Sequence, residues 1–200
     1  MFIVQSYPLA IAFCFITMLC WGSWGNTQKM AAKTWRYELF YWDYVVGMLL
    51  FSLILCFTLG SIGSEGRPFL EDLAQAAPQA LGSVLLGGVI FNASNILLSA
   101  SVSLAGLAVA FPLGVGLALV LGVVINYLGA PKGDPVILFL GVALIVIAIV
   151  CNGIASGRVR KEPGSSAQNR KGILLAVLAG VLMSFFYRFV AAAMDLDNFE

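Results

Sequence analysis

Long apolar runs separated by short polar segments fill almost the whole chain. A helix that crosses a bilayer needs about 20 mostly apolar residues. Runs of this length predict six membrane-spanning helices, near residues 8–25, 39–59, 80–100, 104–128, 135–156 and 172–194. The third and fourth share one uncharged stretch, and we place the break between them at Ser101-Val102-Ser103. The pattern predicts an all-α, polytopic membrane helix bundle.

The composition also indicates a membrane protein. Sixty per cent of the 200 residues are apolar, 10% are charged and the mean hydropathy is +0.96. A soluble domain is about 25% charged, so this chain has too little polar surface to cover itself in water. The net charge of +1 excludes a nucleic-acid-binding protein that relies on basic charge. The partner that the composition predicts is the lipid bilayer.

Basic residues concentrate on one side of the predicted membrane. Three follow the first span and five lie in residues 157–171, whereas the connections on the other side carry only Arg67 and Lys132. Cytoplasmic loops are enriched in Lys and Arg. We therefore expect the N-terminus outside, residues 25–38 and 157–171 in the cytoplasm, and the protein in the inner or plasma membrane of the cell.

A linker divides the predicted spans into five and one. Residues 157–171 contain the one linker-like composition of the chain, Pro163-Gly164-Ser165-Ser166. A five-helix unit duplicated in tandem inserts its second copy upside down, as in inverted-repeat transporters. The spans 8–24 and 172–189 are alike, because both are apolar, rich in small residues and end in aromatic clusters. We interpret 1–156 as a five-helix repeat and 172–200 as the first helix and tail of an inverted second repeat, truncated from a ten-helix transporter.

The sequence holds no residue set typical of an enzyme. It has no histidine, and its four cysteines lie in apolar runs without a Cys-x-x-Cys pair. Carboxylates at a shared depth, which acid–base catalysis would need, do not occur in the predicted spans. We expect no catalytic residue, no metal site and no cofactor, and therefore no enzyme.

Polar residues inside the third span form a stripe. Gly88, Asn92, Asn95 and Ser99 are spaced by four, three and four residues, which places them on one helix face. We call these four residues the amide stripe. Carboxamides offer both donors and an acceptor, so Asn92 and Asn95 suit binding of a neutral polar solute. The alternative is hydrogen bonding between helices, at roughly 0.6 kcal/mol per bond.

The first span carries a second polar and aromatic face, formed by Thr17, Trp21, Trp24 and Gln28. Tryptophan can stack on a planar ring or a sugar. Thr17, Trp21 and Trp24 are therefore candidates for substrate binding. The alternative for the tryptophans is an anchor at the membrane interface.

Small residues recur at every fourth position of the fourth span. Gly106, Ala110, Gly114, Ala118 and Gly122 follow the pattern that lets helix backbones approach closely. We expect this small-residue stripe to pack against another helix. A homodimer through the stripe, and a gate where Pro112 kinks the helix, are alternatives.

Two charged residues lie inside predicted spans. Asp43 is a candidate for coupling to an ion, proton or sodium, and the alternative is an anchor paired with Lys33 or Arg36. Arg188 lies about 24 Å into the sixth span at 1.5 Å per residue, which is past the midplane. It can extend outward to the membrane surface or bind an anionic or carbonyl group of a solute.

Several segments together resemble one transporter family. They are Met1-Phe-Ile-Val-Gln-Ser6, Leu39-Phe-Tyr-Trp-Asp43-Tyr-Val-Val-Gly47, the amide stripe, Leu107-Ala-Val-Ala-Phe-Pro112 and Ile125-Asn-Tyr-Leu128. Over residues 1–156 the chain resembles the ureide permeases of the drug/metabolite transporter superfamily, near the glucose and rhamnose permeases. The short linker is similar to the bacterial branch. The resemblance implies a ten-helix inverted repeat that carries neutral heterocycles such as allantoin, with proton coupling.

We therefore expect a secondary-active permease for a small neutral polar metabolite, a ureide or nucleobase-like heterocycle, which works by alternating access. A sugar permease or a drug/metabolite exporter of the same superfamily are the nearest alternatives. A non-transporting membrane subunit that dimerises through the small-residue stripe is the alternative from another class.

Overall fold

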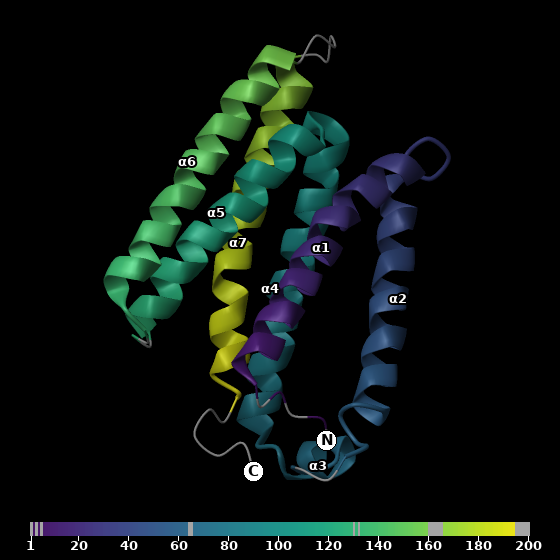
Figure 1. The fold of residues 1–200 in the computed structure, drawn as a ribbon. Helices are drawn as coiled ribbons and strands as arrows, with labels where there is room; N and C mark the ends of the chain where they lie inside the picture. The colour runs from purple at the N-terminus through teal and green to yellow at the C-terminus, as the bar shows by residue number, and fades with distance from the viewer. Residues whose placement is uncertain are drawn as a thin grey trace. The chain divides into compact units, whose positions relative to one another are not determined.

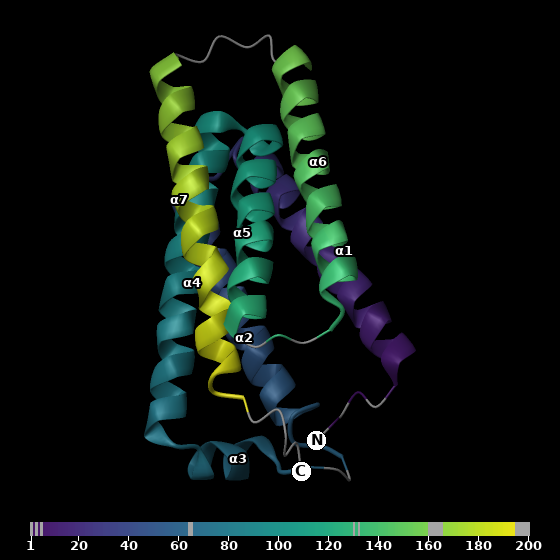
Figure 2. The same cartoon turned by 90° about the vertical axis from the view of Figure 1, so that its left-hand side faces the viewer.

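The computed structural model describes residues 2, 4, 6–63, 66–129, 131, 133–159 and 166–194, and within them it contains helices and no strand. Figure 1 and Figure 2 show these helices. All of them except α3 are long and apolar enough to cross a membrane. The predicted all-α fold with six spans is therefore confirmed. The helices are α1 (Tyr7–Ala31), α2 (Tyr37–Phe57), α3 (Phe69–Gln75), α4 (Pro78–Ala105), α5 (Leu107–Gly129), α6 (Pro135–Val159) and α7 (Ser166–Ala191).

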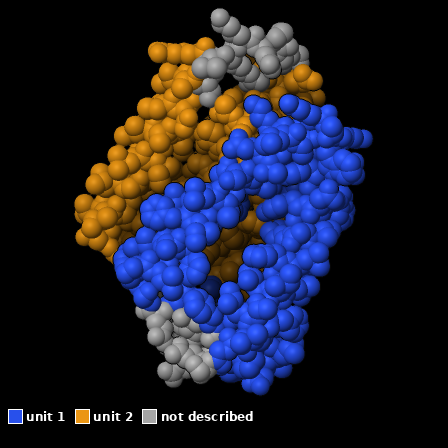
Figure 3. Space-filling model, turned by 45° about the vertical axis from the view of Figure 1, so that its right-hand side comes forward, with its two compact units in different colours: residues 1–81, 194–200 blue, residues 82–193 orange. Residues whose placement is uncertain are grey.

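The chain forms two compact units (Figure 3). The first contains α1, α2, α3 and the first residues of α4, through Leu81. The second contains the rest of α4 together with α5, α6 and α7. We describe each unit by itself.

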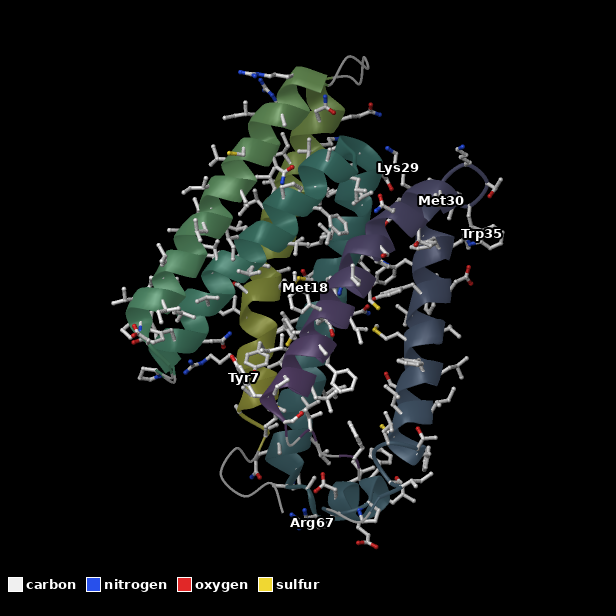
Figure 4. All side chains as sticks on the ribbon, in the orientation of Figure 1. Tyr7, Met18, Lys29, Met30, Trp35 and Arg67 are labelled. Carbon is white, nitrogen blue, oxygen red and sulfur yellow. The ribbon has the colours of Figure 1, made fainter. Side chains whose placement is uncertain are left out.

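In the first unit, α1 and α2 form an antiparallel hairpin. At the open end of the hairpin, the Phe2 amide donates to the Leu59 carbonyl at 2.7 Å. Near the connection between the helices, the Trp24 and Tyr44 rings lie 5.5 Å apart. Lys29, Met30 and Trp35 are at this connected end, and Arg67 is at the opposite end beside α3 (Figure 4). The hairpin therefore separates the basic cluster that follows the first span from Arg67.

The break between the third and fourth spans lies at Gly106, so its predicted position at Ser101-Val102-Ser103 is wrong. The Ser101 hydroxyl donates to Gly172 and the Ser103 hydroxyl donates to Ser99. With both hydroxyls bonded, the helix continues to Ala105. Gly106 has a φ of +81°, a left-handed conformation that L-residues with a side chain rarely adopt. This glycine therefore ends α4, and α5 begins at the next residue and continues through Pro112.

The helices also extend into the predicted linker 157–171. Helix α6 continues to Val159 and α7 begins at Ser166, so only 160–165 separate them. The Pro163-Gly164-Ser165 segment lies outside the described residues. A second difference is α3, a short helix between the second and third spans that the sequence pattern did not predict.

In the second unit, contacts define the direction of each helix relative to its neighbours. Gly114 of α5 faces Ala176 of α7, and Gly122 faces Ser184 further along both helices, so α5 and α7 are parallel. Along α6, Ile149 contacts Gly116 of α5, and Phe139 stacks edge-on against Tyr127 with 5.5 Å between ring centroids. This order is reversed, so α6 is antiparallel to α5 (Figure 2). Helix α6 thus packs against one side of α5, whereas the closest backbone approaches are among α4, α5 and α7.

Replacing Gly106 by alanine should lower the stability of the protein by about 1–2 kcal/mol, because the new Cβ disfavours the left-handed backbone. No atom lies within 4 Å of the Cβ position, so the cost comes from the backbone alone. Gly82→Ala is the control, since this site is helical and also has open space, where alanine is favoured by about 1 kcal/mol. Thermal unfolding in detergent measures both, and equal melting temperatures for the two variants would contradict the assignment.

Candidate functional site

Three serine hydroxyls on α4 bind backbone carbonyls of α7. Ser83 donates to Phe189, Ser94 to Ala179 and Ser101 to Gly172, each with an oxygen–oxygen distance of 2.7 Å. Ser94 and Ser101 are fully buried. We call these three residues the serine row.

The serine row fixes how α7 lies along α4. Its members are eleven and seven positions apart, about three and two turns at 3.6 residues per turn, so they occupy one face of α4. Their acceptors follow in reverse order along α7, which makes the two helices antiparallel. Because a slip of one residue would misalign all three bonds, the row defines a single register.

Glycines allow these helices to approach closely. A Cβ atom on Gly180 of α7 would lie 2.7 Å from the carbonyl oxygen of Gly114 on α5. A Cβ on Gly172 would lie 2.5 Å from the Cβ atom of Ala105 on α4. Such distances are shorter than van der Waals contact, so these positions admit no side chain without a shift of the backbone.

The small-residue stripe of α5 is divided between two environments. Ala110, Gly114 and Ala118 are buried, and Gly114 contacts Leu98 of α4 and Ala176 of α7. A Cβ on Gly122 would lie 3.8 Å from the carbonyl oxygen of Ser184. Gly106 instead forms the helix break and has no neighbour at its Cβ position. The buried members of the stripe contact helices of the same chain and are not accessible to a second copy.

The amide stripe of α4 contains both buried and exposed residues. Asn95 and Ser99 are buried, whereas Gly88 and Asn92 are exposed. The Asn95 amide donates to the Phe91 carbonyl of its own helix at 3.0 Å. Gly87 and Ser94 face α7. Gly88 and Asn95 each follow one of these positions by one residue, which turns the helix by about 100°. The amide stripe therefore lies on a different face of α4 from the serine row.

The candidates on α1 differ in their surroundings. Thr17 is exposed and its hydroxyl donates to the Phe13 carbonyl of the same helix at 2.9 Å. Trp24 stacks on Tyr44 of α2, which in turn lies 5.8 Å from the ring of Tyr41. Trp21 is half-buried. The Trp24 ring is thus held by the α1–α2 hairpin.

Asp43 accepts a hydrogen bond from the Trp35 indole, with 3.0 Å between Nε1 and Oδ2. The alternative was an anchor in which Asp43 pairs with Arg36. Among the described residues, Arg36 pairs instead with Glu38 at 3.2 Å. Glu38 is only two positions from Arg36 and lies in the first turn of α2. The nearer carboxylate therefore takes the guanidinium, and Asp43 binds a neutral donor.

Arg188 is exposed and lies in the last turn of α7. Its guanidinium occupies the space where a side chain on Gly129 would be, at the end of α5. The carboxyl end of a helix carries partial negative charge, so this position favours a cation. The absence of a side chain at Gly129 is what leaves room for the guanidinium.

No group of three or more His, Cys, Asp or Glu that could hold a metal occurs among the described residues. The four cysteines are free thiols, and three of them, Cys14, Cys20 and Cys151, are exposed. The side chains at the candidate positions are carboxamides, indoles, a hydroxyl and isolated charges, which can stack on or form hydrogen bonds with a small molecule.

Two features of this helix group were missed from the sequence. One is the serine row, and the other is a run of small residues along α7, in which Gly172, Ala176, Gly180 and Ser184 recur at every fourth position and are buried. The spacing of seven and eleven between serines in an uncharged span was the available signal for the first. The four-residue repeat was the signal for the second.

Residues 40–167 match the family model described as ureide permease, which is more than half of the chain. The chain belongs to the ureide permease family. Ureide permease 2 of Arabidopsis thaliana is 31% identical over 163 residues, which cover 79% of this chain and 41% of that relative. Probable ureide permease A3 of Vigna unguiculata is 29% identical over 153 residues, which cover 74% of this chain and 40% of the relative. No solved structure matches the chain.

Family membership and the six apolar helices establish this ureide permease family member as an integral, multi-pass membrane protein. Ureide permease 1 of Arabidopsis thaliana, 29% identical over 157 residues, is also matched over only 40% of its length. The chain therefore spans about two fifths of the length of these relatives. The placement of the chain in the drug/metabolite transporter superfamily and in a bacterial branch stays a prediction.

Replacing all three members of the serine row by alanine should destabilise this ureide permease family member by about 2 kcal/mol, at roughly 0.6 kcal/mol per bond between membrane helices. The bonds are far apart and should add. Ser52→Ala is the control, because the Ser52 hydroxyl donates to Met48 of its own helix. Thermal unfolding in one detergent compares the variants, and a triple variant as stable as the wild type would show that the row contributes nothing.

Proposed function

We propose that the protein is a secondary-active permease for a small neutral polar solute of the ureide or nucleobase-like class. The observation that carries the proposal is membership in the ureide permease family, whose named relatives are ureide permeases. Ureides combine N–H donors with carbonyl acceptors in a compact uncharged molecule. A binding site for them needs groups that both donate and accept hydrogen bonds and that add no net charge.

Asn92 meets this requirement on the exposed part of the amide stripe. Its carboxamide offers two N–H donors and a carbonyl acceptor, and its position on α4 is exposed, away from the serine row. A donor–acceptor pair on the solute can be matched by this one side chain. Asn95, whose amide is bonded within α4, orients the stripe behind it.

The remaining candidates are proposed contacts with narrower roles. Trp21 and Trp24 offer flat apolar surfaces for a planar heterocycle, and Thr17 offers a hydroxyl. Arg188 offers donors for a solute carbonyl. Asp43, bound to Trp35, is the candidate for coupling to a proton or sodium ion.

The proposed orientation has the N-terminus outside. Lys29 lies at the connected end of the α1–α2 hairpin, near Lys33 and Arg36 in sequence, while Arg67 lies at the other end of the same unit (Figure 4). The basic end faces the cytoplasm by the positive-inside rule. The solute therefore crosses between an outer side near α3 and an inner side at this connection.

Alternating access in this permease keeps α4, α5 and α7 together. The serine row defines one register between α4 and α7, and the Gly114–Gly180 approach leaves no space for sliding between α5 and α7. Helix α7 is the first helix of the proposed second repeat. The moving body then contains helices from both repeats, and the two repeats do not rock as intact halves.

Asn92→Ala should raise the KM for allantoin or uracil uptake roughly tenfold, since the loss of about 1.4 kcal/mol of binding is a factor of ten and lies within the range of one neutral hydrogen bond. The measurement is radiolabelled uptake of allantoin, uracil and glucose by cells that express the full reading frame. Asn152→Ala, an exposed asparagine on α6, is the matched control.

Uptake of glucose alone would replace the ureide class by a sugar. Saturable uptake of allantoin or uracil that is indifferent to Asn92 would retain the permease and remove Asn92 from the site. No uptake of any of the three, with normal amounts of protein in the membrane, would contradict the proposed solutes.

A disulfide that joins α4 to α7 should leave uptake unchanged, because these helices move together in the proposed mechanism. The substitutions G87C and F189C introduce it in a chain without the native cysteines. A Cβ built on Gly87 lies 3.3 Å from the Cβ of Phe189, close to the roughly 3.8 Å of a disulfide. Uptake is compared before and after oxidation, and a loss that a reductant restores would show that these helices move relative to each other.

A further inference from the structure

Helix α3 separates an apolar side from a polar side within seven residues. At 100° per residue, Phe69, Leu70, Leu73 and Ala74 lie on one arc, and Glu71, Asp72 and Gln75 lie on the other. Leu70 is 60% exposed and Leu73 is 45% exposed. Two large apolar side chains on so short a helix therefore have no full cover within the described residues.

The first residue of α3 is fixed against the end of a membrane span. The Phe69 ring packs edge-on against Phe57, the last residue of α2, with 5.6 Å between centroids. The Phe69 amide also donates to the Gly60 carbonyl at 3.0 Å. Because α2 crosses the membrane, the side of α3 that holds Phe69 is the side that faces the bilayer.

The polar arc of α3 is held together on the opposite side. The Arg67 guanidinium binds the Gln75 side chain, and the Gln75 amide donates to Asp72 at 3.0 Å. Arg67 also lies 3.9 Å from the Asp72 carboxylate. This network keeps Asp72 and Gln75 turned away from the apolar arc.

The connections hold α3 at the membrane surface. Only Ala76 and Ala77 separate α3 from α4, and an extended residue covers at most about 3.6 Å. The end of α3 is therefore within roughly 11 Å of the start of a membrane span. The headgroup layer adds roughly 5–8 Å on each side of the hydrocarbon core, so this short connection keeps α3 in or next to the headgroup layer of one leaflet.

We propose that α3 is a lipid-docking surface that lies in the plane of the membrane interface, with Leu70, Leu73 and Ala74 among the upper acyl chains. Apolar side chains of interfacial helices reach about 5–10 Å into this boundary. The face consists of a few side chains and is far smaller than the roughly 800 Å² per partner of a stable protein interface. Its apolar surface continues that of the predicted membrane span α2 through Phe57, which contacts Phe69 and is itself exposed.

The chemistry of the polar arc defines the kind of lipid. Glu71 and Asp72 are acidic, and Arg67 is already bound to Asp72 and Gln75. No basic cluster is present on α3 to attract anionic headgroups. Docking is therefore driven by apolar burial, and zwitterionic lipid is sufficient.

Nitroxide accessibility in vesicles tests this proposal. Single cysteines are introduced as Leu73→Cys and, for the polar arc, Glu71→Cys in the full chain without the native cysteines. Each is spin-labelled in phosphatidylcholine vesicles. At position 73, we expect oxygen to relax the label more strongly than a water-soluble nickel chelate does. At position 71, we expect the reverse. Replacing about a third of the lipid by phosphatidylglycerol should leave both ratios unchanged.

Three outcomes would overturn the proposal. Equal, water-like accessibility at both positions would place α3 off the membrane. Exclusion of both reagents at position 73 would mean that protein, and not lipid, covers the face. A shift of the label toward the membrane only with phosphatidylglycerol would mean that headgroup charge, and not apolar burial, drives the docking of α3. Ala74→Cys and Gln75→Cys form a second pair on opposite arcs, to be used if a variant of the first pair is not monodisperse.

Discussion

A polar group inside a bilayer has no water to bond with, and the packing of this chain depends on how its buried hydroxyls find acceptors. In α4, three serines reach carbonyl oxygens of α7 that already belong to a helix. A serine side chain is short, so this contact requires the two backbones to lie close together. Glycine and alanine at Gly87, Gly172 and Ala176 provide that approach. The small residues and the hydroxyls therefore act as one interaction.

This close packing also decides which polar residues of α4 are buried and which are exposed. Ser94 and Ser101 are used between helices, while Asn95 is used within its own helix. Asn92 is one member of the amide stripe that remains exposed, because its face of α4 is turned from α7 by the geometry of the helix. Two asparagines that are three positions apart thus lie in different environments.

The sequence predicts the six spans well because length and apolar composition are local properties of a segment. The helix break could not be placed from the sequence, since Ser101 continues α4 by bonding to Gly172, 71 residues further along. The partner of Asp43 could not be identified for a related reason, because Arg36 has a nearer carboxylate in Glu38. Helix α3 was missed because seven residues are too few for a periodic signal. For the helix break and for Asp43, the missing information is a contact between side chains or segments, which spacing alone does not contain.

The same contacts bear on which helices of a predicted inverted repeat can move together. The predicted inverted repeat places α7 in a second repeat, but the hydrogen bonds and glycine contacts of α7 bind it to α4 and α5 of the predicted first repeat. Evolutionary units and moving units need not coincide, since the first follow from gene duplication and the second from interaction energy. A helix that shares three hydrogen bonds and a backbone contact with its neighbours is expected to move with them. In the proposed alternating-access mechanism, the boundary of motion then lies where side chains, not backbones, separate the helices.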